Sequence, residues 1–183
     1  MNKLISILLI LLIFPILLLI SLFIILADGF PFIYSQEKYG LNDKIFKLYK
    51  FRTMSKNTPL RATENFHDAE KYIIFGGKFL RKFSLDELPQ LFNVLYGDMN
   101  FIGPRPSMTS NEELVLKLWK EKGINTIKPG ITGWAQVNGR DLNSFEKKVE
   151  LDYYYYQNKS LLLDIKIIFM TFKVVLLTKL VRH

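Results

Sequence analysis

The sequence has no cysteine and only two histidines, His67 and His183. The lack of cysteine excludes disulfides and thiolate metal sites. Two histidines are too few for a multi-histidine zinc site, and they disfavour serine–histidine catalysis. The sequence also lacks a Walker-type glycine loop and a G-x-G-x-x-G motif. A reactive acid, base or nucleophile must therefore come mainly from aspartate, glutamate, lysine, tyrosine or serine.

Acidic residues are too few to balance the basic ones. The chain carries 25 Lys and Arg against 17 Asp and Glu, a formal net charge of +8. This excess favours an anionic partner, which could be nucleic acid, anionic lipid or a phosphorylated substrate. The length of 183 residues suits one domain with a proper core, and no internal repeat or low-complexity segment is present.

One long apolar run, from Leu4 to Ala27, contains no charged residue. As a helix it would be about 36 Å long, enough to cross a bilayer core. The length of the run and the D-G-F-P sequence after it disfavour a cleaved signal peptide. Pro15 lies near the middle, so the helix either spans with a kink or bends back with both ends on one face. Basic residues concentrate after the run, which predicts under both geometries that the chain from residue 29 onward is cytoplasmic.

The remaining pattern predicts a helix-rich α+β single domain over residues 30–183, after a membrane-embedded helix at 1–29. We expect a strand at 45–54, a loop or short helix at 55–70, and a loop with a short strand at 128–140. Helices are expected at 70–82, 84–96, 110–122 and 144–155. The mainly apolar stretch 160–183 contains too many charges to span a membrane. Its pattern predicts a helix packed on the domain or lying in the membrane interface. The tyrosine run 153–156 suits either that interface or the core and its rim.

The stretch RKFSLDELPQ, residues 81–90, fits a helix start in two ways. Ser84 and Glu87 have the spacing of a capping box, but residue 89 should then donate to the Leu85 carbonyl, and proline has no N–H. Asp86 as the cap places Pro89 inside the first turn, where proline is tolerated. Both alternatives put Asp86 and Glu87 at the mouth of a helix, directly after two basic residues.

These acids are surrounded in the sequence by the basic segments KLYKFR, GKFLRK, GPRP and NGR. Taken separately, each segment is more typical of a solvated surface. Taken together, they describe a phosphate site beside a carboxylate pair. Aspartate can attack phosphorus, but attack on a diphosphate needs a divalent cation and Arg or Lys donors to offset the negative charge. Magnesium suits carboxylate ligands, and the prolines around Arg105 favour bidentate phosphate binding by that side chain.

Three segments, FKLYKFRTM (46–54), GKFLRKFSLDELPQLFNVLYGDMNFIGPRP (77–106) and KPGITGWAQVNGR (128–140), occur in this order. They resemble the bacterial sugar transferase family, the monotopic phosphoglycosyl transferases. The later ELDYYYYQN and LLLDIKI are similar to the C-terminal region of that family. The resemblance covers nearly the whole chain and indicates the minimal form of the family.

The resemblance implies an enzyme that moves a sugar-1-phosphate from a UDP-sugar to undecaprenyl phosphate and releases UMP. This reaction is the first membrane step in assembling a capsule, an exopolysaccharide, an O-antigen or the glycan of a glycoprotein. The family pattern makes Asp86 the nucleophile of a covalent aspartyl intermediate, with Glu87 as its catalytic partner and both as Mg²⁺ ligands. It also implies that Pro15 breaks a re-entrant membrane helix, and that the catalytic domain lies on the cytoplasmic face of the bacterial inner membrane.

Substrate binding is expected from side chains in the basic segments and the two later motifs, namely Lys50, Arg52, Arg81, Arg105, Gln136, Arg140 and Asp152. The expected partners are the UDP-sugar, undecaprenyl phosphate and anionic membrane lipids. A non-enzymatic basic scaffold or lipid-binding protein is the main alternative, and an aspartyl-phosphate hydrolase is another. Nucleic-acid binding is disfavoured because the basic residues are interleaved with apolar runs and follow a membrane anchor.

Overall fold

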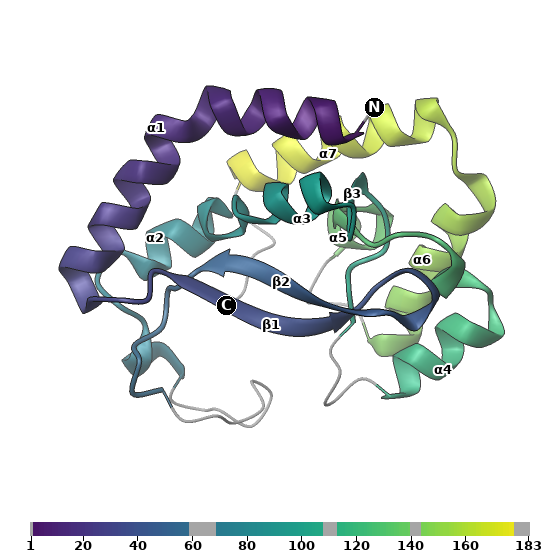
Figure 1. Ribbon diagram of the computed structural model, residues 1–183. Coiled ribbons are helices and arrows are strands. Elements are labelled where there is room, and N and C mark those ends of the chain that lie inside the picture. The colour runs from purple at the N-terminus through teal and green to yellow at the C-terminus, as the bar shows by residue number, and fades with distance from the viewer. Residues whose placement is uncertain (1, 59–68, 108–112, 140–143, 178–183) are drawn as a thin grey trace.

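The computed structural model describes residues 2–58, 69–107, 113–139 and 144–177 (Figure 1). The expected apolar helix is present as α1, Asn2–Asp28. It is the one helix in the described ranges that is long and apolar enough to cross a membrane. Pro15 lies within it, and Figure 1 shows that its two halves run in different directions. Most of its side chains are exposed, and only Ser6, Leu17, Ile20 and Ile24 are buried.

Both ends of α1 are bonded to the rest of the protein. Near the first residues, the Ser6 hydroxyl donates to the carbonyl oxygen of Leu91 at 2.6 Å. At the far end, the guanidinium of Arg52 lies 3.1 Å from the Asp28 carboxylate and donates to the Gly29 carbonyl oxygen at 2.6 Å. A cation at a helix C-terminus also suits the helix dipole.

An antiparallel hairpin crosses below α1. It pairs β1, Ile33–Tyr39, with β2, Ile45–Phe51, and a short 3₁₀ turn, Leu41–Asp43, connects the strands. The predicted strand at 45–54 is therefore confirmed up to Phe51. Strand β1 was not predicted, because its IYSQEKY sequence is too polar to show an apolar strand pattern.

The predicted helix at 70–82 is wrong as one continuous element. The structure has a 3₁₀ turn at Ala69–Tyr72 and a separate helix α2 at Gly77–Lys82. Gly76 between them adopts a left-handed conformation with φ of 71°, which an α-helix cannot contain.

Neither predicted helix start at residues 84–96 is correct. Ser84 is left-handed with φ of 53° and makes no side-chain cap, and Asp86 lies inside a 3₁₀ turn, Leu85–Glu87. The helix proper, α3, begins later, at Gln90, and ends at Tyr96. Pro89 explains the delay, since it cannot donate a backbone hydrogen bond and the preceding residues form tight i to i+3 bonds instead.

A second, parallel pair joins β3, Asn100–Ile102, to β4, Gly130–Thr132. It confirms the short strand expected within 128–140, whereas β3 and the short helix α5, Trp134–Val137, were not predicted. Glycine is required where the two segments meet. A Cβ on Gly130 would collide with the backbone nitrogen of Gly103, and one on Gly133 would collide with the Gly103 carbonyl oxygen.

Three further helices complete the fold, namely α4 (Glu113–Glu121), α6 (Phe145–Asn158) and α7 (Leu161–Leu177), with a 3₁₀ turn at Ile124–Thr126. The predicted helices at 110–122 and 144–155 are confirmed within the described residues, and Ser144 caps α6 by accepting from the Lys147 N–H. The Tyr155 hydroxyl donates to the Asp164 carboxylate at 2.8 Å, which joins α6 to α7. Tyr155 is buried and Tyr153 packs on the α4–α6 core, as the core-and-rim alternative expected.

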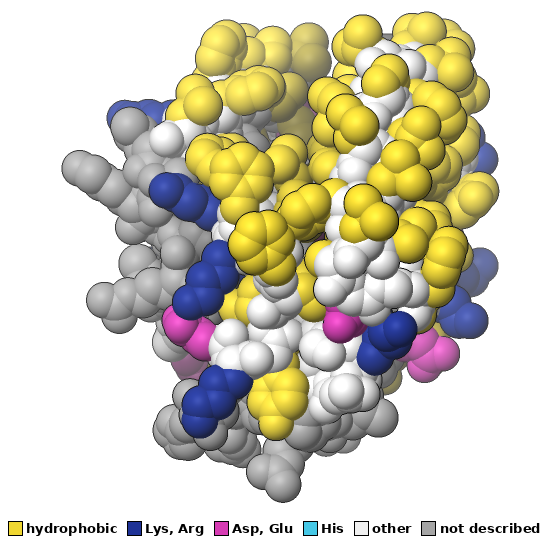
Figure 2. Space-filling model, turned by 90° about the vertical axis from the view of Figure 1, so that its left-hand side faces the viewer, with side chains coloured by type: hydrophobic (Ala, Val, Ile, Leu, Met, Phe, Trp, Pro, Cys, Tyr) yellow, Lys and Arg dark blue, Asp and Glu magenta, His cyan; other side chains and the backbone are white. Residues whose placement is uncertain are grey.

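The apolar surface gathers on one side of the molecule. Figure 2 shows hydrophobic side chains over most of the upper part of the face that carries α1 and α2, while the Asp and Glu side chains in view lie lower. Large exposed hydrophobic residues in α1, α2, α7 and the turn before α2 include Leu12, Leu26, Phe75, Phe79, Phe169 and Leu176. Such a large apolar surface is typical of a membrane-facing side.

We expect Arg52→Met to lower the free energy of unfolding by about 3 kcal/mol, because it leaves the Asp28 carboxylate and the last carbonyls of α1 without their buried donor. Lys56→Met is the control and should change stability by less than about 0.5 kcal/mol, since Asp28 contacts the backbone N–H of Lys56. Denaturant unfolding in detergent micelles measures both. Equal effects of the two substitutions would contradict this role of Arg52.

Candidate functional site

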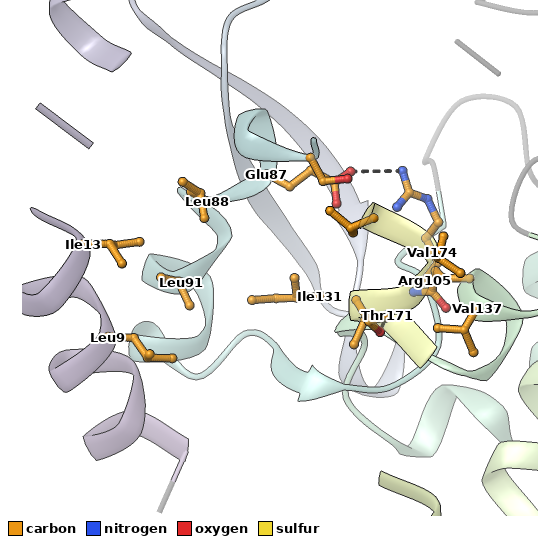
Figure 3. A pocket seen from close by; sticks show the side chains of 14 residues that line it. Leu9, Ile13, Glu87, Leu88, Leu91, Arg105, Ile131, Val137, Thr171 and Val174 are labelled. Atoms are coloured by element: carbon orange, nitrogen blue, oxygen red, sulfur yellow. Dashed lines mark hydrogen bonds and ion pairs between the residues drawn. The ribbon is translucent and has the colours of Figure 1, made fainter. Parts of the chain in front are cut away.

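The 3₁₀ turn before α3 presents two adjacent carboxylates. Asp86 is half-buried, while Glu87 is buried. The Oε1 atom of Glu87 lies 2.9 Å from the Nζ atom of Lys50 on β2 and 3.6 Å from a guanidinium nitrogen of Arg105 (Figure 3). The structure thus brings together four predicted site residues from three separate segments, with a buried carboxylate between two cations.

A side chain that the sequence analysis missed sets the position of β2 against α3. Asn93 is fully buried, and its amide oxygen accepts from the Tyr49 N–H while its amide nitrogen donates to the Lys47 carbonyl oxygen, at 3.1 and 2.7 Å. These bonds hold Lys50 one residue further along, beside Glu87. The available signal was an amide between the apolar residues Phe92 and Val94 of the QLFNVLY helix.

Arg105 reaches Glu87 because of the glycine contacts described above. Gly103 packs directly on Gly130 and Gly133, and the Gly130 N–H donates to the Pro104 carbonyl oxygen at 2.9 Å. This contact brings the GPRP turn and the segment that leads into α5 together. Arg105 and Gln136 therefore line the same cavity although they lie far apart in the sequence.

Arg81 adds a further positive charge close to Asp86. Its Nε atom donates to the Thr53 hydroxyl at 2.8 Å. Burial lowers the pKa of the Arg81 guanidinium, and the nearby Asp86 carboxylate acts in the opposite direction. Because arginine has so high an ordinary pKa, Arg81 stays charged at neutral pH. It therefore supplies positive charge beside the proposed nucleophile.

A cavity of about 300 Å³ opens beside Glu87 and Arg105 (Figure 3). Its apolar walls come from α1, the start of α3 and α7, with side chains Leu9, Ile13, Leu88, Leu91, Val174 and Val175. Thr132 and Thr171, which share a 2.7 Å hydrogen bond, also line it and tie β4 to α7. Gln136 is buried there, and neither polar atom of its amide has a hydrogen-bond partner in the part of the chain that the structure describes.

Two of the predicted substrate-binding residues, Arg52 and Asp152, have partners in other parts of the fold. Arg52 is bound to the end of α1. Asp152 is buried beside Trp119 in the region where α4 packs on α6. Neither is among the residues that line the cavity. Arg140 lies outside the described residues. These placements indicate that Arg52 and Asp152 stabilise the fold.

A magnesium ion would find two protein carboxylates here, Asp86 and Glu87. The described residues contain no group of three or more His, Cys, Asp or Glu side chains that could hold a metal ion. This donor set fits Mg²⁺, which typically uses one or two carboxylates and completes its shell with water and substrate phosphates. It does not fit zinc, which needs at least three protein ligands.

Taken together, these features define a class of protein, namely an α+β protein with a long exposed apolar helix and a carboxylate pair among cations. Such an arrangement suits phosphate groups beside an apolar surface. Comparison with known sequences then narrows the class. A profile of the bacterial sugar transferase family matches residues 1–178.

The chain is 44% identical over 154 residues to "Uncharacterized sugar transferase EpsL" of Bacillus subtilis (strain 168), an alignment that covers 84% of this chain and 74% of that protein. It is 41% identical over 177 residues to the UDP-glucose:undecaprenyl-phosphate glucose-1-phosphate transferase of Klebsiella pneumoniae, covering 91% of this chain and 37% of the relative. It is 35% identical over 170 residues to the UDP-N-acetylgalactosamine-undecaprenyl-phosphate N-acetylgalactosaminephosphotransferase of Aeromonas hydrophila, covering 88% and 39%.

The chain belongs to the bacterial sugar transferase family, as its motifs predicted. It spans about three quarters of the B. subtilis relative and less than two fifths of the other two. Their names specify different sugars, glucose in one and N-acetylgalactosamine in the other.

The buried Asp152 generates a pH prediction. Burial raises the pKa of its carboxyl well above the ordinary value, although Trp119 and Lys148 act against this shift. Below about pH 3 the group is protonated in both the folded and the unfolded chain. As pH rises further, the unfolded chain loses this proton first, so the folded state is destabilised by up to about 1.4 kcal/mol per pH unit until the raised pKa is reached.

Asp152→Asn removes this titration. The stability of the variant relative to the original protein should therefore increase between about pH 5 and pH 7, as measured by thermal unfolding in detergent. Glu150→Gln, which alters an exposed carboxylate on the same helix, should leave the pH dependence unchanged. A stability difference between Asp152→Asn and the original protein that does not change with pH would rule out a protonated buried Asp152.

Proposed function

We propose that this protein is a phosphoglycosyl transferase that moves a sugar-1-phosphate from a UDP-sugar to undecaprenyl phosphate. The observation that carries the proposal is the placement of Glu87 between Lys50 and Arg105, directly after Asp86 and beside an apolar cavity. Relatives named as undecaprenyl-phosphate sugar phosphotransferases support the substrate classes. Relatives named for different sugars leave the sugar unassigned. The product would begin the assembly of a surface polysaccharide or a glycoprotein glycan.

In the first step, a carboxylate oxygen of Asp86 attacks the phosphorus that carries the sugar. The bond from this phosphorus to the bridging oxygen breaks, and UMP leaves with the bonding electron pair. The enzyme now holds a sugar phosphate as an acyl phosphate on Asp86. Because Asp86 is only half-buried, a substrate phosphate can approach it from solvent.

In the second step, a phosphate oxygen of undecaprenyl phosphate attacks the same phosphorus. The bond between phosphorus and the Asp86 oxygen breaks, which restores the carboxylate and releases the polyprenyl diphosphate sugar. Both steps bring negatively charged groups together. Lys50, Arg81 and Arg105 offset this charge, and a guanidinium can bind two phosphate oxygens at once.

We also propose that Asp86 and Glu87 hold Mg²⁺ together with substrate phosphate oxygens. The adjacent carboxylates of Asp86 and Glu87 support this choice, since Mg²⁺ is typically bound by one or two carboxylates together with substrate phosphates. When bound, the ion would offset charge on the phosphate groups. Within the protein, Glu87 has the second task of keeping Lys50 and Arg105 beside Asp86.

We also propose that α1 is re-entrant and lies on the cytoplasmic face of the bacterial inner membrane, and contacts at both ends of the helix support the re-entrant geometry. The first residues of α1 bond to α3 and β3, through Ser6 and Asn2, and its last residue bonds to Arg52, directly after β2. Helix α3 is itself clamped to β2 by Asn93. Ends separated by a hydrocarbon core about 30 Å thick could not both make these contacts with one domain.

The Asp86→Asn substitution should remove the nucleophile with little change in shape. We expect UMP release from a panel of UDP-sugars, with undecaprenyl phosphate and Mg²⁺ present, to fall by more than about 10³-fold. The intact-protein mass should also show no sugar-phosphate adduct when the lipid is omitted. Omitting Mg²⁺ from the original enzyme should likewise stop turnover.

The matched control for this experiment is Glu70→Gln, which alters an exposed carboxylate paired with Lys78 and should keep full activity. Undiminished UMP release by Asp86→Asn would refute the proposed chemistry and favour a scaffold. Release of free sugar phosphate by the original enzyme without lipid would instead indicate a hydrolase.

The absence of cysteine allows single-cysteine reporters of topology. In inside-out membrane vesicles, a membrane-impermeant maleimide should label both Lys3→Cys and Lys56→Cys, because a re-entrant α1 has both ends on the cytoplasmic side. Leu12→Cys, in an exposed apolar part of the helix, should stay protected by lipid. Labelling of Lys3→Cys from the opposite side only would establish a spanning helix.

A further inference from the structure

The cavity beside Glu87 has a charged end and an apolar body. Figure 3 shows Glu87 and Arg105 together on one side, whereas Leu9 and Ile13 lie across the cavity on α1. The remaining walls, from α3 and α7, are mainly aliphatic. A ligand that fills this space would place an anionic group at Arg105 and a hydrocarbon against the helices.

Two of the helices that form the apolar walls, α1 and α7, also carry many exposed apolar side chains. On α1, the cavity-lining Leu9 has the exposed neighbours Leu8, Leu11 and Leu12. On α7, the exposed residues Phe172 and Leu176 flank the cavity-lining Val174 and Val175. The cavity therefore lies between two elements that both present hydrocarbon-compatible surfaces. With a volume of about 300 Å³, it can take only part of a long chain.

A second, larger groove provides a comparison. It has a volume of about 620 Å³ and lies between the second half of α1, the hairpin and the opposite side of α3, where Pro89 and Phe92 line it. No charged side chain is among its lining residues. It could take hydrocarbon but has no cationic side chain among its lining residues to pair with a phosphate, so charge complementarity distinguishes the two sites.

We propose that the acceptor lipid enters sideways from the membrane between α1 and α7, with its phosphate at Arg105 and Lys50 and its first isoprene units in the smaller cavity. The rest of the chain then stays in the bilayer. This inference rests on the proposed function and adds the path by which one substrate reaches Asp86. The water-soluble donor has no need of this path, so blocking it should affect only the second step.

The test is a substitution that places a larger side chain in the cavity, at the wall far from Glu87 and Arg105. Leu9→Trp should leave the first step intact, with one equivalent of UMP and one covalent adduct formed per enzyme from an active UDP-sugar without lipid. Its KM for undecaprenyl phosphate should rise, or its kcat fall, by about tenfold or more. Leu12→Trp on the exposed side of α1 and Leu18→Trp in the larger groove are the matched controls and should behave like the original enzyme.

A normal first step with unchanged acceptor kinetics in Leu9→Trp would overturn the inference while leaving the proposed function intact. The inference would also be overturned, with the proposed function intact, if Leu18→Trp rather than Leu9→Trp blocked the second step. Absence of the first step in the original enzyme would instead count against the proposed function itself.

Photocrosslinking of the unaltered protein provides a second measurement that does not depend on the folding of a variant. A prenyl phosphate with a diazirine near its phosphate end should label residues of α1 and α7 around Leu9, Ile13 and Val174. Excess undecaprenyl phosphate should abolish this labelling and phosphatidylglycerol should not. Labelling confined to the larger groove, or equal competition by phosphatidylglycerol, would overturn the inference, and the latter would assign the cavity to a phospholipid.

Discussion

The site depends on one buried carboxylate that is held between two cations. Glu87 would be costly to bury alone, and the ammonium of Lys50 and the guanidinium of Arg105 offset that cost. The same ion pairs gather positive charge beside Asp86, where the proposed chemistry brings negatively charged phosphates together. The requirement for charge balance in the folded protein and the requirement for charge balance in the reaction are therefore met by the same side chains.

Contacts between distant parts of the chain determine where this charge cluster lies. Asn93 sets the position of β2, and the contact of Gly103 with Gly130 sets the position of the GPRP turn. Thr132 and Thr171 tie the same region to α7. Contacts at both ends keep α1 against the domain. The result is a polar reaction centre directly beside apolar helices, which suits a reaction between a water-soluble nucleotide sugar and a membrane lipid.

Several elements could be predicted because their signals are local. The charge-free run predicted α1, Ser144 marked the start of α6, and the family motifs indicated Asp86, Glu87 and Arg105. Errors arose where a single residue interrupts a helical pattern. The left-handed Gly76 divides the helix expected at 70–82, and Pro89 delays the start of α3. An apolar pattern shows which face of a segment is buried, but it does not show where the hydrogen-bond geometry changes.

The sequence by itself determined the long apolar helix, the helix-rich α+β class, the family and the candidate carboxylates, since these depend on composition, periodicity and short motifs. Only the tertiary structure decided which of the basic residues meet those carboxylates. Lys50 and Arg105 contact Glu87, whereas Arg52, two residues from Lys50, binds the end of α1, and Asp152 lies in the α4–α6 core. The physical reason is that charges pair through space, and the strand pairing and glycine contacts that bring them together join segments far apart in the chain.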